Sequence, residues 1–239
     1  MSTASIVIIG DEILGNKFVD ENTPYLLRKC AELNLQVQSV QIIPDTLERI
    51  SKTVREEANR STYVFTTGGV GPTHDDLTFE GVAKAFNVET FHHPELVALL
   101  EKHGTELTQA SLRMAQVPIG TELLPTSRGF PQVKINNVFI FPGVPSLLKA
   151  KFEAIEHLLV GRKKFHAKVY LDTHETVIAQ KLTQIQESLH SVNLGSYPRF
   201  HEEPSLILTV EGFEQAALEQ AQRVLEAEFR EYLYTPYYT

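Results

Sequence analysis

The sequence of 239 residues has little cysteine, no tryptophan, two methionines and no long apolar run. Its single cysteine, Cys30, cannot form an internal disulfide, which excludes a disulfide-stapled secreted fold. The longest apolar run near the N-terminus, Ile6–Ile9, is too short for a signal peptide or membrane anchor and has no basic residue before it. We therefore expect a soluble, cytoplasmic protein with no membrane partner.

Positive charge is also scarce, with 22 Lys and Arg against 30 Asp and Glu and a net charge of −8. This balance argues against a general affinity for nucleic acid or anionic membranes. It leaves room for a local phosphate site, because backbone amides bind phosphate without lysine. Hydrophobic residues make up 42% and charged residues 22%, as in ordinary globular proteins, so the chain has the means to bury a core.

Strands and helices alternate over residues 1–160, which we take as the first domain. β-Branched runs predict the strands Ala4–Ile9, Gln36–Ile43, Thr62–Thr67 and, after a hairpin turn at Asn136, Asn137–Phe141. Start signals predict helices that begin after Thr23 as N-cap, at a capping box over Asp45–Glu48 and at Pro145. Helical spacing predicts three more helices, over Thr78–Phe86, Pro94–His103 and Leu107–Met114. Cys30 falls on an apolar helix face and is expected in the core. This order predicts an α/β fold with a parallel, helix-covered sheet.

A polar break at Gly161–Lys164 marks the domain boundary, and residues 165–239 form the second domain. Its pattern predicts the strand Ala167–Leu171, the helix Glu175–Leu189, the strands Leu194–Tyr197 and Leu206–Glu211, and the helix Glu214–Leu233. The tail Tyr232–Thr239 is expected to be a strand or a docked extension. The βαββα order predicts a small α+β domain with an antiparallel sheet.

The strongest site signal lies in residues 66–80, where a buried strand runs into a glycine-rich turn and then a helix. Glycines allow close backbone approach to a ligand at the carboxyl end of a strand. The segment lacks the Gly-Lys-Ser/Thr of a P-loop and the third glycine of a dinucleotide fingerprint. Asp75, Asp76 and Glu80 would repel a phosphate unless a divalent cation lies between them. Alternatively, the segment is an ordinary junction with Thr78 as N-cap and Glu80 favouring the helix dipole.

Two further segments follow predicted strands and should lie at the same edge of the sheet. Gly10–Gly15 carries the adjacent acids Asp11 and Glu12, and Phe141–Pro145 carries Gly143 before a helix. Each has a plain alternative, a solvated acidic turn and an ordinary turn. Arg113 is the cation expected to reach this edge.

The pattern Thr-Gly-Gly-x-Gly-Pro-Thr-x-Asp-Asp-x-Thr-x-Glu at residues 67–80 resembles the molybdopterin-binding-like domain family, and Gly10–Gly15, Asn22-Thr23 and Pro142–Pro145 match it in the same order. Within the family the chain is similar to the N-terminal domains of competence/damage-inducible (CinA-type) proteins and of eukaryotic FAD synthases. The resemblance implies a three-layer α/β/α core. It also implies a substrate site at Thr67, Gly68, Gly69, Gly71, Pro72, Thr73, His74, Thr78, Asn22 and Gly143.

In these two branches the resemblance implies divalent-metal-dependent nucleotide pyrophosphatase activity, on ADP-ribose in CinA-type domains and on FAD in FAD synthases. Two departures bear on this. Only Ser127–Pro131 stands where CinA-type chains carry Gly-Thr-Ala-Pro-Gly, which favours the FAD-synthase branch. The sequence also has neither the FAD-forming domain nor the deamidase domain of those relatives, so we expect neither of those reactions.

The hypothesis is a hydrolase of FAD or ADP-ribose, with Asp11, Glu12, Asp75 and Asp76 as catalytic carboxylates. Asp11, Asp75, Asp76 and Glu80 are the expected ligands of a divalent ion, with Mg²⁺, Mn²⁺ and Co²⁺ not distinguished. The amides of Gly68, Gly69 and Gly71 would cradle phosphate. The alternatives are a non-catalytic nucleotide- or molybdopterin-binding module and a molybdopterin adenylyltransferase. Partners are a nucleotide and, as is common in the family, further copies of the chain.

Overall fold

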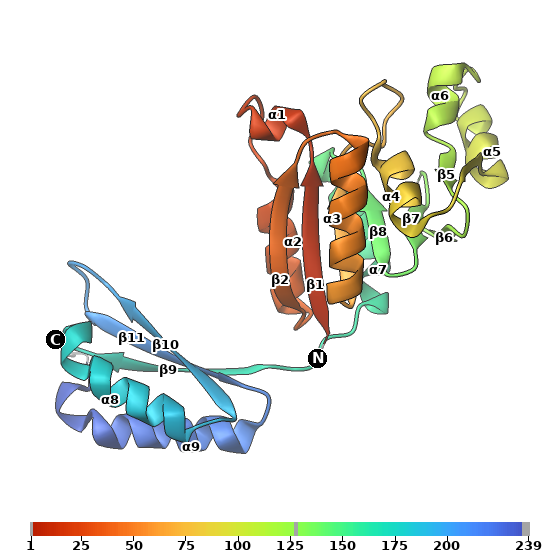
Figure 1. The fold of residues 1–239 in the computed structure, drawn as a ribbon. Coiled ribbons are helices and arrows are strands. Elements are labelled where there is room, and N and C mark those ends of the chain that lie inside the picture. The colour runs from red at the N-terminus through yellow and green to blue at the C-terminus, as the bar shows by residue number, and fades with distance from the viewer. Residues whose placement is uncertain (1, 127–128, 236–239) are drawn as a thin grey trace. The chain divides into compact units, whose positions relative to one another are not determined.

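The computed structural model describes residues 2–126 and 129–235. The chain divides into two compact units, Met1–Gly161 and Arg162–Thr239 (Figure 1). Within the described residues there is no helix of the length and apolarity that a membrane span requires.

The first unit is built on a six-stranded sheet. Its strands, in spatial order, are β2 (Gln36–Ile43), β1 (Thr3–Ile9), β3 (Tyr63–Thr67), β8 (Val138–Phe141), β7 (Gln132–Ile135) and β6 (Glu122–Leu124). The first four run parallel, and β7 and β6 are antiparallel additions. The predicted turn at Asn136 joins β7 to β8 and holds Asn136 at φ +50. The parallel α/β fold is confirmed.

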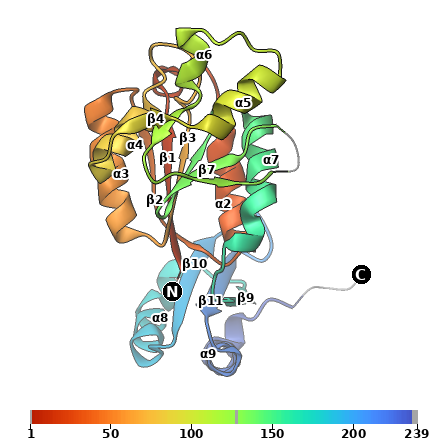
Figure 2. The same ribbon diagram turned by 90° about the vertical axis from the view of Figure 1, so that its right-hand side faces the viewer.

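Helices cover both faces of this sheet, as Figure 2 shows. One face packs α3 (Leu47–Arg60) and α4 (Thr78–Phe86); the other packs α2 (Asn22–Glu32) and α7 (Pro145–Ile155). Strand β1 serves both cores, because its side chains alternate: Val7 and Ile9 enter the first core, and Ile6 and Ile8 the second. Cys30 is buried in the second core, as predicted, and burial raises the pKa of its thiol to about 12.

Several smaller elements complete the first unit. They are α1 (Asp11–Leu14), the pair β4 (Thr90–His92) and β5 (Gln116–Pro118), α5 (Pro94–Lys102), α6 (Gln109–Arg113) and the 3₁₀ turn η1 (Glu156–Leu158). The sequence did not predict α1, β4, β5 or β6. These are elements of only three or four residues, too short to show a hydrophobic period.

Two predicted helix starts are wrong. Helix α2 begins at Asn22, and the Asp20 side chain, not Thr23, accepts from the first helical amides. Thr46 is the N-cap of α3 and makes no side-chain cap bond, so the capping box does not form. Helix α4 begins at Thr78, as predicted, so only the alternative in which Thr78 is its N-cap is wrong. At α2 the Asp20 side chain replaces the expected cap, and near α3 the distant Asp11 amide binds Asp45.

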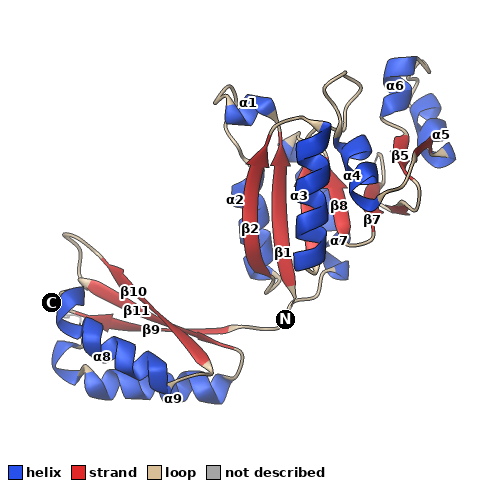
Figure 3. Cartoon of the chain, viewed as in Figure 1, coloured by secondary structure: helices blue, strands red, loops and turns tan. Residues whose placement is uncertain are grey.

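The second unit is a three-stranded antiparallel sheet with two helices (Figure 3). The strands, in spatial order, are β10 (Val192–Pro198), β11 (Leu206–Gly212) and β9 (Phe165–Leu171), and the helices are α8 (Glu175–Ser188) and α9 (Gln215–Glu228). Helix α9 ends earlier than predicted and is followed by the 3₁₀ turn η2 (Arg230–Tyr232). Leu233 then bridges Leu171 of β9, so this part of the tail docks on the sheet edge. Residues 236–239 of the predicted tail lie outside the described residues.

Candidate active site

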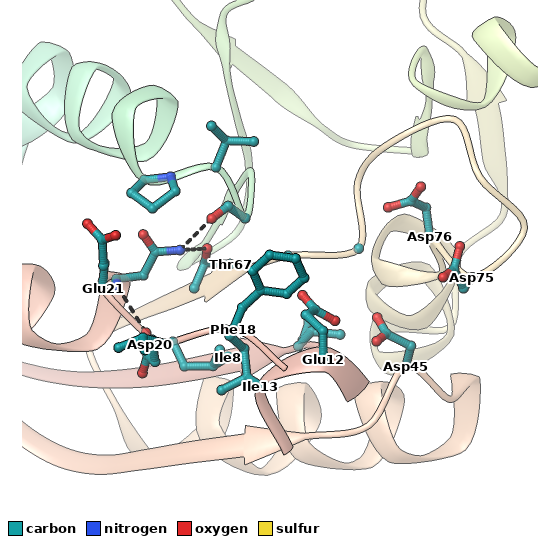
Figure 4. Close-up of a pocket in the computed structure, with 18 residues that line it drawn as sticks. Ile8, Glu12, Ile13, Phe18, Asp20, Glu21, Asp45, Thr67, Asp75 and Asp76 are labelled. Atoms are coloured by element: carbon teal, nitrogen blue, oxygen red, sulfur yellow. Dashed lines mark hydrogen bonds between the residues drawn. The ribbon is translucent and has the colours of Figure 1, made fainter. Parts of the chain in front are cut away.

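A pocket of about 620 Å³ lies at the carboxyl ends of β1, β3 and β8, where a parallel sheet places its ligand sites (Figure 4). The segments that follow β2, β1, β3 and β8 all contribute to it. Its lining residues are Ile8, Ile9, Glu12, Ile13, Phe18, Val19, Asp20, Glu21, Asn22, Asp45, Thr67, Gly68, Gly69, Asp75, Asp76, Gly143, Val144 and Pro145. The structure therefore brings together the three segments that the sequence placed at one edge.

The glycine turn after β3 is built around Gly68. Its φ of +103 lies in the region that favours glycine, and a Cβ there would stand 2.0 Å from the Ile9 carbonyl oxygen. The Gly68 amide donates to the Phe141 carbonyl at 3.2 Å, and the Thr78 hydroxyl donates to the Gly68 carbonyl at 2.7 Å. The predicted phosphate contact from the Gly68 amide is therefore wrong, because this amide is already used to tie β3 to β8.

The three amides that follow Gly68 in the turn differ from the Gly68 amide in their hydrogen bonding. Within the described residues, the backbone amides of Gly69, Val70 and Gly71 have no hydrogen-bond acceptor. Successive amides of this kind in a turn form a concave anion site. Free amides thus remain at Gly69 and Gly71, two of the three positions expected from the sequence, and at Val70 between them.

One side of the pocket, which we call the anchored side, consists of Asn22, Thr67, Gly68 and Gly143. Asn22 is only 7% exposed, and its Nδ2 donates to Thr67 Oγ1 at 3.0 Å and to the Gly143 carbonyl at 2.8 Å. The Thr67 hydroxyl in turn donates to the Pro142 carbonyl at 2.9 Å. These bonds join α2, β3 and the segment after β8. The anchored side therefore fixes the mutual positions of three pocket-lining segments.

The opposite side, which we call the acidic side, consists of Glu12, Asp45, Asp75 and Asp76. Asp45 Oδ2 accepts from the Asp11 amide at 2.8 Å. Burial raises the pKa of Asp45, the negative charges of Glu12, Asp11 and Asp75 add to the rise, and the bond from the Asp11 amide opposes it. Figure 4 shows the Asp45, Asp75 and Asp76 carboxylates on the same side of the pocket.

The aspartates of the glycine loop also bind within the loop itself. Asp76 Oδ2 accepts from the Thr73 amide at 2.8 Å and from the Thr73 hydroxyl at 2.5 Å. Hydrogen bonding from Thr73 is also the main cause that lowers the pKa of Asp75, so this carboxyl stays charged. The Arg113 guanidinium donates to the Asp76 carbonyl at 3.1 Å. Arg113 thus reaches the loop, as predicted, but holds it through the backbone from outside the pocket lining.

Several predicted site residues do not line the pocket: Asp11, Gly71, Pro72, Thr73, His74, Thr78 and Glu80. The His74 side chain is 98% exposed. Glu80 Oε1 lies 3.5 Å from Arg113 Nη2, an ion pair that takes it away from any metal in the pocket. Asp11 faces solvent and contributes its amide to Asp45. Conversely, Asp45 lines the pocket but was not predicted as a site residue, although it follows β2 at the same sheet edge as the other acids.

The charged residues that line the pocket are all acidic. Six of its lining residues are carboxylates and, in the described part of the chain, none of the residues that line it is lysine or arginine. Carboxylate oxygens are the donors that Mg²⁺ and Mn²⁺ prefer. The described residues contain no group of three or more His, Cys, Asp or Glu arranged to hold a metal. The donor set therefore fits an ion bound by one or two carboxylates together with phosphate oxygens, the usual arrangement of Mg²⁺.

Comparison with protein-family models divides the chain at the same place as its two units. Residues 5–162 match the model described as "Probable molybdopterin binding domain", and residues 163–238 match "FAD synthase, middle domain".

Named relatives match both parts. A "Probable FAD synthase" of Caenorhabditis elegans is 29% identical over 226 residues, covering 82% of this chain and 44% of that protein. A "CinA-like protein" of Desulfotalea psychrophila is 26% identical over 215 residues, covering 82% of this chain and 51% of that protein. The chain thus spans about half the length of these two curated relatives.

Among solved structures, the protein CinA of unknown function from Thermoplasma acidophilum has a TM-score of 0.62 and 29% identity, over 66% of this chain and 98% of that one. The likeness thus covers nearly the whole of that protein.

Proposed function

Since the chain belongs to the probable molybdopterin binding domain family, we propose that it is a divalent-metal-dependent hydrolase of a dinucleotide pyrophosphate, FAD or ADP-ribose. The observation that carries the proposal is the pairing, in one pocket, of the free Gly69 amide with carboxylates and no lining lysine or arginine among the described residues. Such a pocket repels a pyrophosphate by itself and accepts one together with a cation. The match of residues 163–238 to the FAD synthase middle domain favours FAD as the first substrate to test.

The acidic side supplies the ligands in this proposal. One or two of Glu12, Asp45 and Asp75 would hold the ion together with phosphate oxygens, in place of the Asp11 and Glu80 expected from the sequence, because these three line the pocket. The ion would supply positive charge to the phosphoryl oxygens and acidify a water. Asp76 is partly committed to Thr73 and serves first to shape the loop.

The remaining chemistry falls to the chain itself. The Gly69 amide, which lies in the pocket lining, would donate to a phosphate oxygen, and the anchored side holds that turn in place. A carboxylate of the acidic side accepts a proton from the attacking water. A phosphorus–oxygen bond to water forms as the bridging phosphorus–oxygen bond breaks. FAD would then give FMN and AMP, and ADP-ribose would give AMP and ribose 5-phosphate.

The test is incubation of the purified protein with FAD or ADP-ribose and Mg²⁺, Mn²⁺ or Co²⁺, with AMP measured by chromatography and a chelator as control. Asp75→Asn should lower the turnover rate by about 100-fold or more, because it removes a charge that stabilises the transition state. Glu101→Gln, which also removes one negative charge but from exposed α5, should leave the rate unchanged. Failure of all metals to produce AMP from either substrate would overturn the hydrolase.

A second candidate is a binding module without turnover. The observation in its favour is that the described residues hold no ready-made group of three metal ligands. This candidate predicts tight binding of a nucleotide or of molybdopterin, no product, and an Asp75→Asn variant changed in affinity alone. Product analysis with ATP and molybdopterin separates both from an adenylyltransferase.

A further inference from the structure

The rim of the pocket carries exposed apolar side chains beside its carboxylates. Phe18 is 68% exposed, Val19 83% and Val144 53%, and all three line the pocket. Large hydrophobic side chains gathered in the open at a pocket mark a ligand surface more often than single scattered ones do. The rim and the acidic side therefore suit different parts of one ligand, a flat apolar part and a metal-bound anionic part.

The backbone around Phe18 is held from both sides. The amides of Lys17 and Phe18 donate to the Glu12 carbonyl at 2.8 and 3.3 Å, and Asn16 adopts a left-handed φ of +53 in the turn after α1. On the other side, Asp20 Oδ1 accepts from the Asn22 and Thr23 amides at 2.9 and 3.0 Å. The segment between α1 and α2 thus presents Phe18 from a fixed turn rather than from a frayed end.

The position of the ring is equally specific. In Figure 4 the Phe18 ring lies between Thr67 and Glu12, with Asp45, Asp75 and Asp76 on one side of it and Asp20 and Glu21 on the other. Carboxylates on both sides exclude a negatively charged group from the space next to the ring. A neutral planar ring has no such conflict.

We propose that Phe18 stacks on the base ring of the nucleotide while the pyrophosphate occupies the acidic side and the glycine turn. This inference rests on the proposed function and adds a specificity residue to it. Stacking on an aromatic side chain accepts any base, because every base has a π-face. Phe18 therefore selects nucleotides over pyrophosphates that lack a ring, without choosing between adenine and isoalloxazine.

The test compares two probes, ADP-ribose and inorganic pyrophosphate, each titrated with Mg²⁺ into the full chain by calorimetry. Phe18→Ala should weaken ADP-ribose binding by about 10-fold, within the range for loss of one stacked base. It should change pyrophosphate binding by less than about twofold. Phe18→Tyr keeps the ring and should restore wild-type affinity. Phe200→Ala, at a 73% exposed phenylalanine in the second unit, is the matched control and should change neither.

Each other outcome has a separate meaning. Unchanged ADP-ribose binding in Phe18→Ala overturns the inference alone, as does an equal loss for both probes, which would mean that Phe18 only shapes the turn. A change in sedimentation without a change in binding would overturn it in favour of contact with a second copy of the chain. A wild-type chain that binds neither probe overturns the proposed function and this inference together.

Discussion

The two sides of the pocket satisfy their polar groups in opposite ways. On the anchored side, the side-chain amide of Asn22 and the hydroxyl of Thr67 donate hydrogen bonds to neighbouring protein oxygens. On the acidic side, Glu12, Asp45 and Asp75 face one another with their charges uncompensated by any lining lysine or arginine among the described residues. We infer that the anchored side stabilises the folded structure. The acidic side is the proposed binding site of a cation.

This difference has a consequence for mutation. A substitution on the anchored side should lower the free energy of unfolding, because it breaks bonds already formed in the free protein. A substitution of Asp45 on the acidic side should cost function and leave stability unchanged or raised, because burial and the neighbouring carboxylates disfavour its charge. Substitutions on one side of the pocket should therefore change mainly stability, and substitutions on the other side should change mainly activity.

The largest expected effect is at Gly68. Gly68→Ala should lower the free energy of unfolding by at least about 3 kcal/mol, because the methyl group would meet the Ile9 backbone and the φ of +103 disfavours alanine. Gly104→Ala is the matched control: its φ is +73 and nothing lies within 4 Å, so only the backbone cost of about 1 kcal/mol remains. Urea unfolding followed by circular dichroism measures both. Equal losses would contradict the close approach of β3 to β1.

The next effect tests the hydrogen bonds of the anchored side. Asn22→Ala should lower the free energy of unfolding by about 1–3 kcal/mol, because it removes the two hydrogen bonds that the buried Asn22 amide donates to Thr67 and to the Gly143 carbonyl. Asn193→Ala, at an exposed position of β10, should stay within about 0.5 kcal/mol of wild type. If the two variants were equally stable, the bonds from Asn22 would not hold these segments together.

The sheet and the edge that carries the site were predictable from sequence, because both follow from short-range patterns. β-Branched runs such as Ala4–Ile9 identify buried strands, and the carboxyl ends of parallel strands must share one edge. The glycine turn was predictable for the same reason. Gly68 needs its special backbone whether or not a ligand is bound.

Two of the errors involve contacts between distant segments. Asp45-Thr46-Leu47-Glu48 has the letters of a capping box, but the Asp11 amide, 34 residues away, binds Asp45 instead. Glu80 was predicted as a metal ligand, but it pairs with Arg113. Arg113 lies 33 residues further on, and no periodicity of the sequence links the two, so this ion pair could not be predicted. Phe18 gave no signal, since an exposed aromatic residue belongs to no apolar period.

The acidic side should respond to pH with a definite sign. Because the pKa of Asp45 is raised in the folded state, its contribution to stability is fully present below its ordinary value near 4 and is lost as pH rises. Asp45→Asn should therefore be at least as stable as wild type at pH 7, and this gain should shrink as pH falls towards 4. Thermal unfolding across pH measures it, with Glu101→Gln as the exposed control. A less stable Asp45→Asn variant at pH 7 would place Asp45 with the anchored side.

The smallest expected effect concerns Asp76, which belongs to the acidic side by charge but binds its own loop. Asp76→Ala removes the acceptor of the Thr73 amide and should speed hydrogen exchange of that amide by about fivefold, the equivalent of one hydrogen bond. Asp75→Ala, the neighbouring carboxylate, accepts no bond from that amide and should leave its exchange unchanged. Global stability should stay within about 0.5 kcal/mol in both, because the loop is exposed. Equally fast exchange in both variants would mean that the two aspartates have the same role in the loop. The glycine loop would then contain no carboxylate that differs from its neighbour by stabilising the fold.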